Sequence, residues 1–374
     1  MLRLRYHPVS DWTPEPVPDT MTVKTRANKQ FGATIKDVAQ SAGVSAMTVS
    51  RVLNGEANVR PETRERVQAA IRDLRYRPNL SARNLARANT WFIGLLYDNP
   101  GAGYVSELLI GALNRCREAG YHLVVETCGA SEDDWAGTVE ALLERGGFDG
   151  LILPPPVCNH AGVLAAIEAA GLPFIRIAPD EAGDHGPGIM TDDRAAARNM
   201  TAHLIEQGHR RIGFIGGPDG QRASRERHAG YCDALAAAGL DVDPALIVAG
   251  EFTYRSGLKA AERLLAMSPR PTAIFAANDD MAVAVIAQAH RLALDLPGEL
   301  SVAGFDDTQS ATAVWPQLTT VRQPVSRMAA EAVGILADRL DAARAGEERG
   351  RAEPHEIGSE IILRESVAPP ASSG

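Results

Sequence analysis

The distribution of apolar residues changes character near residue 91. Beyond that point, short apolar runs alternate with stretches of 12 to 18 residues rich in alanine, leucine, glutamate and arginine. Continuous apolar strands that alternate with amphipathic helices are typical of parallel sheets covered on both faces. The clearest runs lie at residues 92–96, 150–153, 212–215 and 273–276.

Two runs, at 91–94 and 211–215, each begin a similar half-length series of strands and helices. The pattern therefore predicts an α/β core of two doubly wound parallel-sheet lobes, and in such folds ligands bind in the cleft at the carboxyl ends of the strands. We expect this core over 91–364, with lobe 1 at about 91–190 plus 308–322, lobe 2 at about 191–307 plus 323–364, and a disordered tail at 365–374.

Between residues 32 and 77 the apolar positions follow a helical period. Ile35, Val38 and Ala39 have the i, i+3, i+4 spacing of a buried stripe, and Thr34 with Asp37 can form a capping box ahead of it. A first short helix is therefore predicted from residue 35.

A second and a third helix follow closely. Gly43 is placed to end the first helix and Ser45 to cap the second, which makes a helix-turn-helix. On the second helix, one face is apolar and the other is free to enter a major groove, with Ala46, Met47, Ser50 and Arg51 inside an arc of about 140°. Pro61 opens the third helix, whose predicted inward side chains are Val67, Ala70, Ile71 and Leu74. From the pattern alone, any small helical bundle would also fit.

Residues 1–31 contain four prolines between Pro8 and Pro18 and show no apolar period, so a disordered extension is expected, and Met21 is an alternative start. The segment lacks the apolar middle region of a secretory signal, and no run approaches the roughly 20 apolar residues of a membrane span. A cytoplasmic protein without a membrane partner is expected.

Charge is divided unevenly along the chain. The net charge is −9, but residues 1–90 hold 15 Lys and Arg against 8 Asp and Glu, whereas residues 91–374 hold 23 against 39. A basic head on an acidic body indicates a nucleic-acid or membrane partner for the head. The cysteines lie far apart without metal-ligand spacing, so reduced thiols and no metal or cofactor are expected at Cys116, Cys128, Cys158 and Cys232.

Three segments of the head, 34–39 (TIKDVA), 42–45 (AGVS) and 48–54 (TVSRVLN), closely resemble the DNA-binding domain of the lactose/galactose-repressor family of bacterial transcription regulators. The resemblance continues through residues 76–79 and, more loosely, to about residue 364. It implies a homodimer that binds double-stranded operator DNA through a helix-turn-helix domain at 32–77.

By the same resemblance, Ala46 and Met47 match the positions that choose operator bases, and Arg51 matches a base-contacting arginine. The chemistry agrees, because the guanidinium of arginine can donate two hydrogen bonds to guanine O6 and N7, whereas Ala46 and Met47 can make only apolar contacts. The hydroxyl side chains are better suited to phosphate contacts or to helix capping. Phosphate contacts position the protein on the duplex but do not specify the base sequence. The further DNA-binding positions are Thr34, Ser45, Thr48, Ser50, Asn54 and Ala82.

The resemblance also implies a hinge helix at 78–90 that orders on the operator. Leu85 occupies the position of the leucine that wedges into the minor groove and kinks the duplex. The alternative is an amphipathic linker in which Leu85 is buried against the body.

The body resembles periplasmic sugar-binding proteins, as the regulatory cores of this family do. Carried over by position, the effector contacts are Arg227, Asn278 and Asp306 from the second lobe, Gln323 at the crossover, and Tyr104 from the first lobe. These residue types suit a polyol, because Arg and Asn donate, Asp accepts from vicinal hydroxyls, and Tyr104 or Trp315 can stack on a sugar ring. Effector binding is expected to close the lobes and alter the pairing of the hinge helices.

A nucleobase is the rival effector, because an aromatic ring at Tyr104 can equally stack on a purine. Gln221 and Ala223 fall near the polar, base-reading side chains of the purine-responsive member, however, and Ala223 cannot form such hydrogen bonds.

Two rivals from other classes remain. A sugar-active enzyme would use paired carboxyls, and the pairs Asp279–Asp280 and Asp306–Asp307 each follow a strand, but no hydrolase or P-loop motif accompanies them. A solute-binding protein would need export and has no use for residues 34–87. The sequence thus predicts a non-enzymatic, effector-controlled repressor of carbohydrate-utilisation genes, cytoplasmic and nucleoid-associated when bound to its operator.

Overall fold

The computed structural model describes residues 33–53, 59–74, 90–99, 101–129, 131–180, 186–347 and 355–371. The chain divides into two compact units, residues 1–87 and 88–374, and this boundary falls within the predicted hinge segment. Three predicted DNA-binding residues, Asn54, Ala82 and Leu85, lie outside the described residues, as does the predicted N-terminal extension.

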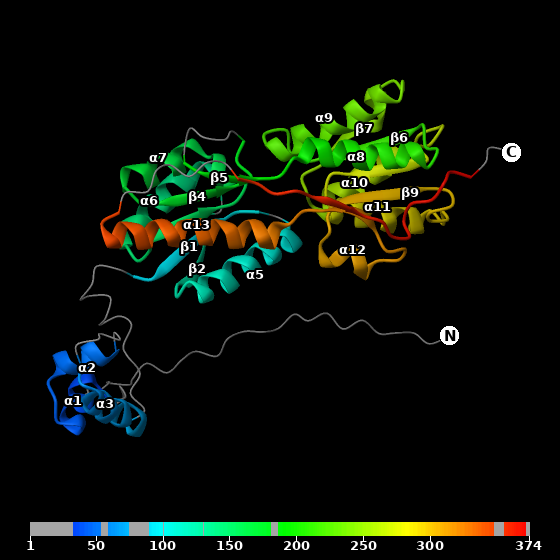
Figure 1. Ribbon diagram of the computed structural model, residues 1–374. Coiled ribbons are helices and arrows are strands. Elements are labelled where there is room, and N and C mark those ends of the chain that lie inside the picture. Colours follow the sequence, from blue (N-terminus) through cyan, green and yellow to red (C-terminus); the bar gives the residue numbers. More distant parts are fainter. Residues whose placement is uncertain are drawn as a thin grey trace, which may run out of the picture. The chain divides into compact units, whose positions relative to one another are not determined.

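The N-terminal unit contains the helices α1 (Ile35–Ala42), α2 (Ala46–Leu53) and α3 (Pro61–Asp73) (Figure 1). Thr34 and Asp37 form the predicted capping box, and Gly43 ends α1 in the left-handed conformation at φ 63°. One fully buried valine from each helix, Val38, Val49 and Val67, contributes to the small core.

One inward prediction for α3 is wrong. Leu74 lies beyond the last helical residue and is exposed, because the helix ends at Asp73 before another turn can direct this side chain toward the core.

The core unit contains two six-stranded sheets, in the orders β11-β5-β4-β3-β1-β2 and β12-β10-β9-β8-β6-β7. Within the described residues, strand pairs are parallel except for β10 with β12. The first sheet consists of β1 (Phe92–Tyr97), β2 (His122–Thr127), β3 (Gly150–Leu153), β4 (Phe174–Ile177), β5 (Gly188–Met190) and β11 (His355–Glu356). The second consists of β6 (Ile212–Gly216), β7 (Ile247–Ala249), β8 (Ala273–Ala276), β9 (Ser301–Asp306), β10 (Thr319–Arg322) and β12 (Glu360–Ile362).

Helices cover both faces of each sheet, which confirms the two doubly wound lobes. The first lobe carries α5 (Ala102–Glu118), α6 (Trp135–Arg145), α7 (Ala161–Ala169), α13 (Val325–Ala345), and the short 3-10 helices Glu132–Asp134 and Val157–Asn159. The second carries α8 (Asp193–Glu206), α9 (Arg222–Ala237), α10 (Tyr254–Leu265), α11 (Asp279–Arg291), α12 (Gln309–Ala313) and the 3-10 helix Pro244–Leu246.

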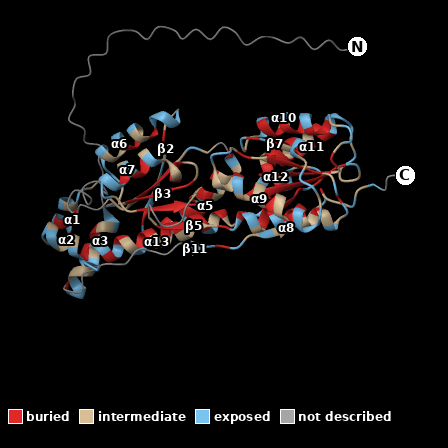
Figure 2. Ribbon diagram, turned by 90° about the horizontal axis from the view of Figure 1, so that it is seen from above, coloured by how far each residue is buried: buried red, intermediate tan, exposed pale blue. Residues whose placement is uncertain are grey.

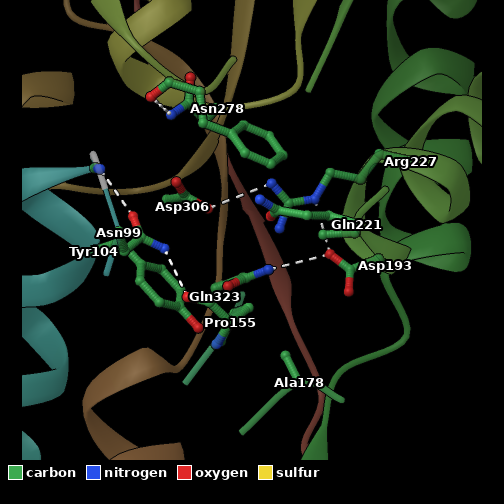
Figure 3. A pocket seen from close by; sticks show the side chains of 13 residues that line it. Asn99, Tyr104, Pro155, Ala178, Asp193, Gln221, Arg227, Asn278, Asp306 and Gln323 are labelled. Atoms are coloured by element: carbon green, nitrogen blue, oxygen red, sulfur yellow. Dashed lines mark hydrogen bonds and ion pairs between the residues drawn. The ribbon is translucent and has the colours of Figure 1, made fainter. Parts of the chain in front are cut away.

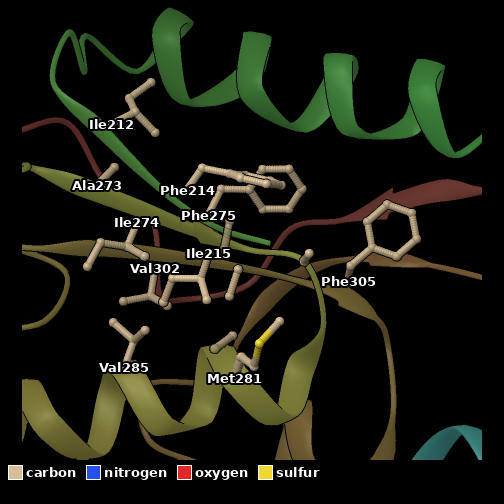
Figure 4. Packing of buried hydrophobic residues seen from close by; sticks show 14 of the residues in the cluster. Ile212, Phe214, Ile215, Ala273, Ile274, Phe275, Met281, Val285, Val302 and Phe305 are labelled. Atoms are coloured by element: carbon tan, nitrogen blue, oxygen red, sulfur yellow. The ribbon is translucent and has the colours of Figure 1, made fainter. Parts of the chain in front are cut away.

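The central strands β3, β4 and β8 are buried along their whole length, as the continuous apolar runs predict (Figure 2). In the second lobe, Phe214 of β6 contacts Phe275 of β8 edge to face, and Met281 and Val285 of α11 pack from the other side (Figure 4). Apolar side chains on both faces of one sheet thus hold two helical layers together.

The chain passes between the lobes three times: from β5 to α8, from β10 to α13, and from β11 to β12. This corrects the expected assignment of the C-terminal half. Residues 308–322 belong to the second lobe, since β10 pairs with β9, and residues 325–345 belong to the first, since α13 packs on α5 and β4.

The predicted disordered tail is also partly wrong. Ser366 is buried and its hydroxyl donates to the carbonyl of Val302, while Ala368 exchanges hydrogen bonds with the side chain of Ser301. Residues 365–371 are therefore docked on the second lobe by polar contacts, which an apolar pattern does not reveal.

Candidate functional site

A cavity of about 50 Å³ lies between the two lobes, at the carboxyl ends of their strands (Figure 3). Its lining comes from both lobes and from two of the three crossings. The lining residues are Asn99, Gly101, Tyr104, Pro155, Ala178, Asp193, Gln221, Ala223, Arg227, Phe252, Asn278, Asp306 and Gln323. Five of the six predicted effector contacts are among them.

Arg227, on the second turn of α9, is the central cation of the cavity. Its Nε donates to Asp193 Oδ1 at 2.8 Å, and its Nη1 lies 3.6 Å from Asp306 Oδ1. The guanidinium carbon lies 3.7 Å from the ring centroid of Phe305, so an aromatic face supports the charged group. Arg227 is 4% exposed, and both carboxylates that neutralise it also line the cavity.

Asp306 ends β9 with an unusual backbone. It and Asp307 have positive φ angles of 112° and 58°, a strained conformation for residues other than glycine. Asp307 is fixed by Arg322 at 2.7 Å and Arg364 at 2.6 Å, whereas Asp306 faces the cavity. Burial raises the pKa of Asp306 well above its usual value, and the nearby Arg227 opposes this shift.

Asn278 and Asp279 have different roles although they are adjacent. The Asn278 side chain caps α11 by accepting from Met281 N at 3.0 Å, and it donates to the carbonyl of Phe252 at 3.0 Å, which leaves one amide hydrogen for a ligand. Asp279 accepts from the hydroxyl of Thr320 at 2.6 Å and from the backbone of Thr308 at 2.7 Å. Burial nevertheless raises the pKa of Asp279 to about 7.

These contacts separate the four clustered carboxylates. Asp279 and Asp307 are held by neighbouring side chains, and only Asp306 of the two predicted pairs lines the cavity. Adjacent acids therefore do not form a catalytic pair across this cavity.

Two crossing segments meet at the cavity. Gln323, just before α13, donates through Nε2 to Asp193 Oδ1 at 3.1 Å, the same oxygen that accepts from Arg227. Asp193 begins α8 and is almost fully buried. A ligand that competes for Arg227 or Asp193 therefore acts directly on the segments that join the lobes.

The first lobe contributes Tyr104 and Asn99. Tyr104 lies near the start of α5, and burial with the nearby Asp306 raises its pKa, so its hydroxyl stays protonated. Asn99 donates to the carbonyl of Pro155 at 3.2 Å and accepts from Gly101 N at 2.8 Å, which fixes the loop beside Tyr104.

Trp315 does not line this cavity. Its side chain is 71% exposed, so the structure does not bring it to the other predicted effector contacts. Conversely, sequence reasoning missed Asn99, Asp193 and Phe252. Phe252 has a positive φ of 55° and presents an aromatic ring, but it follows a short edge strand that has no recognisable ligand motif.

In the N-terminal unit, α2 exposes the side predicted to contact bases. Met47 is 66% exposed and Arg51 is exposed, whereas Ala46 and Ser50 are half-buried. Exposed Ser45 accepts from Thr48 N at 3.1 Å. The hydroxyls of Thr34 and Ser45 therefore shape the helix starts.

Across the described ranges, no helix combines the length and apolar character needed to cross a bilayer, and no group of acidic, histidine or cysteine side chains is arranged to hold a metal ion. All four cysteines are free thiols, and burial raises the pKa of Cys116 to about 11.

Comparison with known proteins extends over most of the chain. Residues 34–79 match the model described as bacterial regulatory proteins, lacI family, and residues 201–367 match a periplasmic binding protein-like domain. The chain is 34% identical over 307 residues to catabolite control protein A of Priestia megaterium, covering 82% of this chain and 92% of that protein. It is 35% identical over 341 residues to the transcriptional repressor PurR of Serratia proteamaculans, with 90% and 97% covered.

Solved structures agree with the sequence relatives. A transcriptional regulator CelR–cellobiose complex superimposes with a TM-score of 0.68 at 30% identity, covering 90% of this chain and all of that one. A Lac repressor dimer bound to operator and the anti-inducer ONPF gives 0.76 at 26% identity, with the same coverage. Together with the helix-turn-helix unit and the two-lobed core, these matches show that the chain belongs to the lacI family of bacterial transcription regulators.

Proposed function

We propose that this regulator is a homodimeric repressor whose affinity for operator DNA is controlled by a small sugar-like effector in the cavity between its lobes. The observation that carries this proposal is the convergence of Arg227, Asp306 and Gln323 with the rings of Tyr104 and Phe252. Arg227 and Gln323 can donate hydrogen bonds to the hydroxyls of a sugar, and the carboxylate of Asp306 can accept them. The aromatic rings match the apolar C–H face of the sugar.

Binding must alter the relation between the lobes. At about 50 Å³ the cavity is far below the roughly 300–1,000 Å³ of typical small-molecule pockets, so a sugar enters only if the lobes part or the lining side chains move. Because Arg227 and Gln323 donate to the same oxygen of Asp193, and Asp193 and Gln323 lie at two crossings, entry of a ligand disturbs all three. Operator binding must change effector affinity by the same factor as the effector changes operator affinity.

A thermal-shift screen of the full-length protein tests the effector class. The panel contains glucose, lactose, cellobiose, ribose, adenine, guanine and hypoxanthine. We expect one sugar to raise the melting temperature, since a ligand at 100 times its Kd adds about 2.7 kcal/mol to the free energy of unfolding. Asp306→Asn should abolish the shift, and in the wild-type protein the shift should weaken as pH falls, because the carboxylate with the raised pKa becomes protonated and loses acceptor capacity.

Each other outcome has a clear meaning. A shift with a nucleobase alone would replace the sugar proposal with a base that stacks on Tyr104 and Phe252. A sugar shift that persists unchanged in Asp306→Asn would place the ligand outside this cavity.

For DNA, we propose that Ala46, Met47 and Arg51 contact operator bases and that the hydroxyl side chains contact the phosphate backbone or cap helices. These are Thr34, Ser45, Thr48 and Ser50. Replacing Arg51 by alanine should weaken binding to a duplex selected by the wild-type protein from a random pool by about 1–3 kcal/mol, because a bidentate contact to guanine is lost. Binding to a duplex of unrelated sequence should change much less.

Fluorescence anisotropy with both duplexes measures the effect. As a control, Arg72→Ala removes an equal charge from the last turn of α3 and should leave the ratio of the two affinities unchanged. An equal loss on both duplexes for Arg51→Ala would assign this arginine to phosphate instead.

A further inference from the structure

The chain enters the core unit beside a largely buried carboxylate, that of Asp149. Asp149, just before β3, accepts from the backbone and hydroxyl of Thr90 at 2.9 and 3.1 Å and from Trp91 N at 2.7 Å. A fourth donor, Arg344 Nη2, lies 2.9 Å away. Thr90 and Trp91 are the first residues after the segment that leads from the DNA-binding unit, so Asp149 holds the chain where it enters the core.

Trp91 fixes the direction of the chain at this point. Its φ of 60° lies in the left-handed region, which is strained for a bulky side chain and persists only where the surroundings enforce it. The guanidinium carbon of Arg344 lies 4.2 Å from the ring centroid of Trp91, and the ring centroids of Trp91 and Tyr121 are 5.4 Å apart. The indole is therefore held by a cation and a second ring.

Arg344 belongs to the last turn of α13 and connects that helix to the chain entry. It donates to Asp341 at 2.8 Å and to the hydroxyl of Tyr121, which itself donates to Asp341 at 3.0 Å. Trp91, Tyr121, Asp149 and Arg344, named here the entry clamp, thus join the start of β1, the start of β2, the start of β3 and the end of α13.

The other end of α13 reaches the effector cavity. Gln323 lines the cavity two residues before the helix begins and donates to Asp193. At about 1.5 Å per residue, the 21 residues of α13 span roughly 30 Å. The helix packs closely on α5, since a Cβ on Gly111 would lie 1.9 Å from the carbonyl oxygen of Ser326. One continuous helix therefore has the cavity at its first turn and the entry clamp at its last.

We propose that the entry clamp is a set of positioning residues for operator binding, through which α13 passes the state of the effector cavity to the chain that leads to the DNA-binding unit. This inference rests on the proposed control by an effector in the cavity. The role of Asp149 and Arg344 requires no contact with ligand or DNA; they fix the direction in which the chain leaves Trp91.

The first test measures operator affinity without any effector. With the duplex selected by the wild-type protein, Arg344→Gln is expected to weaken binding at least fivefold, while binding to a duplex of unrelated sequence stays within twofold. Arg327→Gln is the matched control, because it removes the same charge from the same helix and breaks an exposed pair with Glu331. If circular dichroism shows that Arg344→Gln does not fold, Arg344→Lys takes its place. This variant keeps the charge but loses the planar guanidinium that contacts Asp149, Asp341 and Tyr121 together.

The second test addresses transmission along α13. Operator affinities of Gln323→Ala, Arg344→Gln and the double variant form a thermodynamic cycle. Transmission predicts that the double variant departs at least threefold from the product of the single effects. Additive effects would overturn the role of α13, and wild-type operator affinity in Arg344→Gln would overturn the clamp itself.

Both tests use DNA alone, so they remain informative if no sugar binds the cavity. A failed thermal-shift screen would reject the effector class, whereas the clamp is rejected only by the operator measurements.

Discussion

Replacing Arg227 by methionine should lower the free energy of unfolding of the core unit by about 3–5 kcal/mol, because breaking a buried ion pair leaves an uncompensated charge in the protein interior. Two carboxylates would lose their cation, Asp193 at 2.8 Å and Asp306 at 3.6 Å. The variant should also lose the thermal shift produced by the effector. Urea unfolding followed by circular dichroism measures the stability change.

The matched control is Arg194→Met. Arg194 also pairs with an aspartate, Asp233, at 2.6 Å, but both side chains are at the surface, so the loss should be much smaller than for Arg227→Met. Adding Asp193→Asn to Arg227→Met should restore part of the stability, since it removes one unpaired charge. If Arg227→Met and Arg194→Met were equally mild, Arg227 would not be the counter-charge of this cavity.

Replacing Gly111 by alanine should destabilise the first lobe by about 1–3 kcal/mol, because the added methyl cannot be accommodated without displacing a helix. Its Cβ would lie 1.9 Å from the carbonyl oxygen of Ser326 on α13, which is backbone and cannot rotate away. Operator affinity should fall with stability if α13 carries the signal proposed above. The same unfolding measurement and anisotropy assay report both quantities.

Gly137, in the first turn of α6, provides the opposite control. A Cβ there would meet nothing within 4 Å, and the residue is exposed. Gly137→Ala should therefore raise stability by about 0.4–1 kcal/mol by restricting the unfolded chain. Equal stability changes at the two positions would show that α5 and α13 are not in close contact at Gly111.

The elements of this fold could be predicted because their signals are local. The capping box at Thr34 and Asp37 and the left-handed Gly43 act within a few residues, and continuous apolar runs mark buried parallel strands wherever they occur. The lobe assignment failed beyond residue 307 for the opposite reason. Only Gln323 and Pro324 separate β10 from α13, and nothing in this short segment indicates that its two ends belong to different sheets.

The cavity was predictable only as far as family resemblance reached. Arg227, Asn278 and Asp306 stood in recognisable motifs, but the partner that orients Arg227 did not. Asp193 follows another aspartate at the start of α8, and acidic residues are common there because they interact favourably with the helix dipole. Its contact with Gln323 joins positions 130 residues apart, so no local pattern reveals it. Trp315 shows the reverse error, because a stacking side chain was expected from its type although its place in the fold leaves it exposed.

The third passage between the lobes has a consequence for how the protein is made. Residues 355–356 supply the last strand of the first sheet and residues 360–362 the last strand of the second, so neither sheet has all its strands until the chain has been synthesised to about residue 362. Until these residues are added, β5 and β10 are edge strands of their sheets. A chain that ends near residue 345 would therefore expose β5 and β10 without their partner strands, and unpaired strand edges favour aggregation.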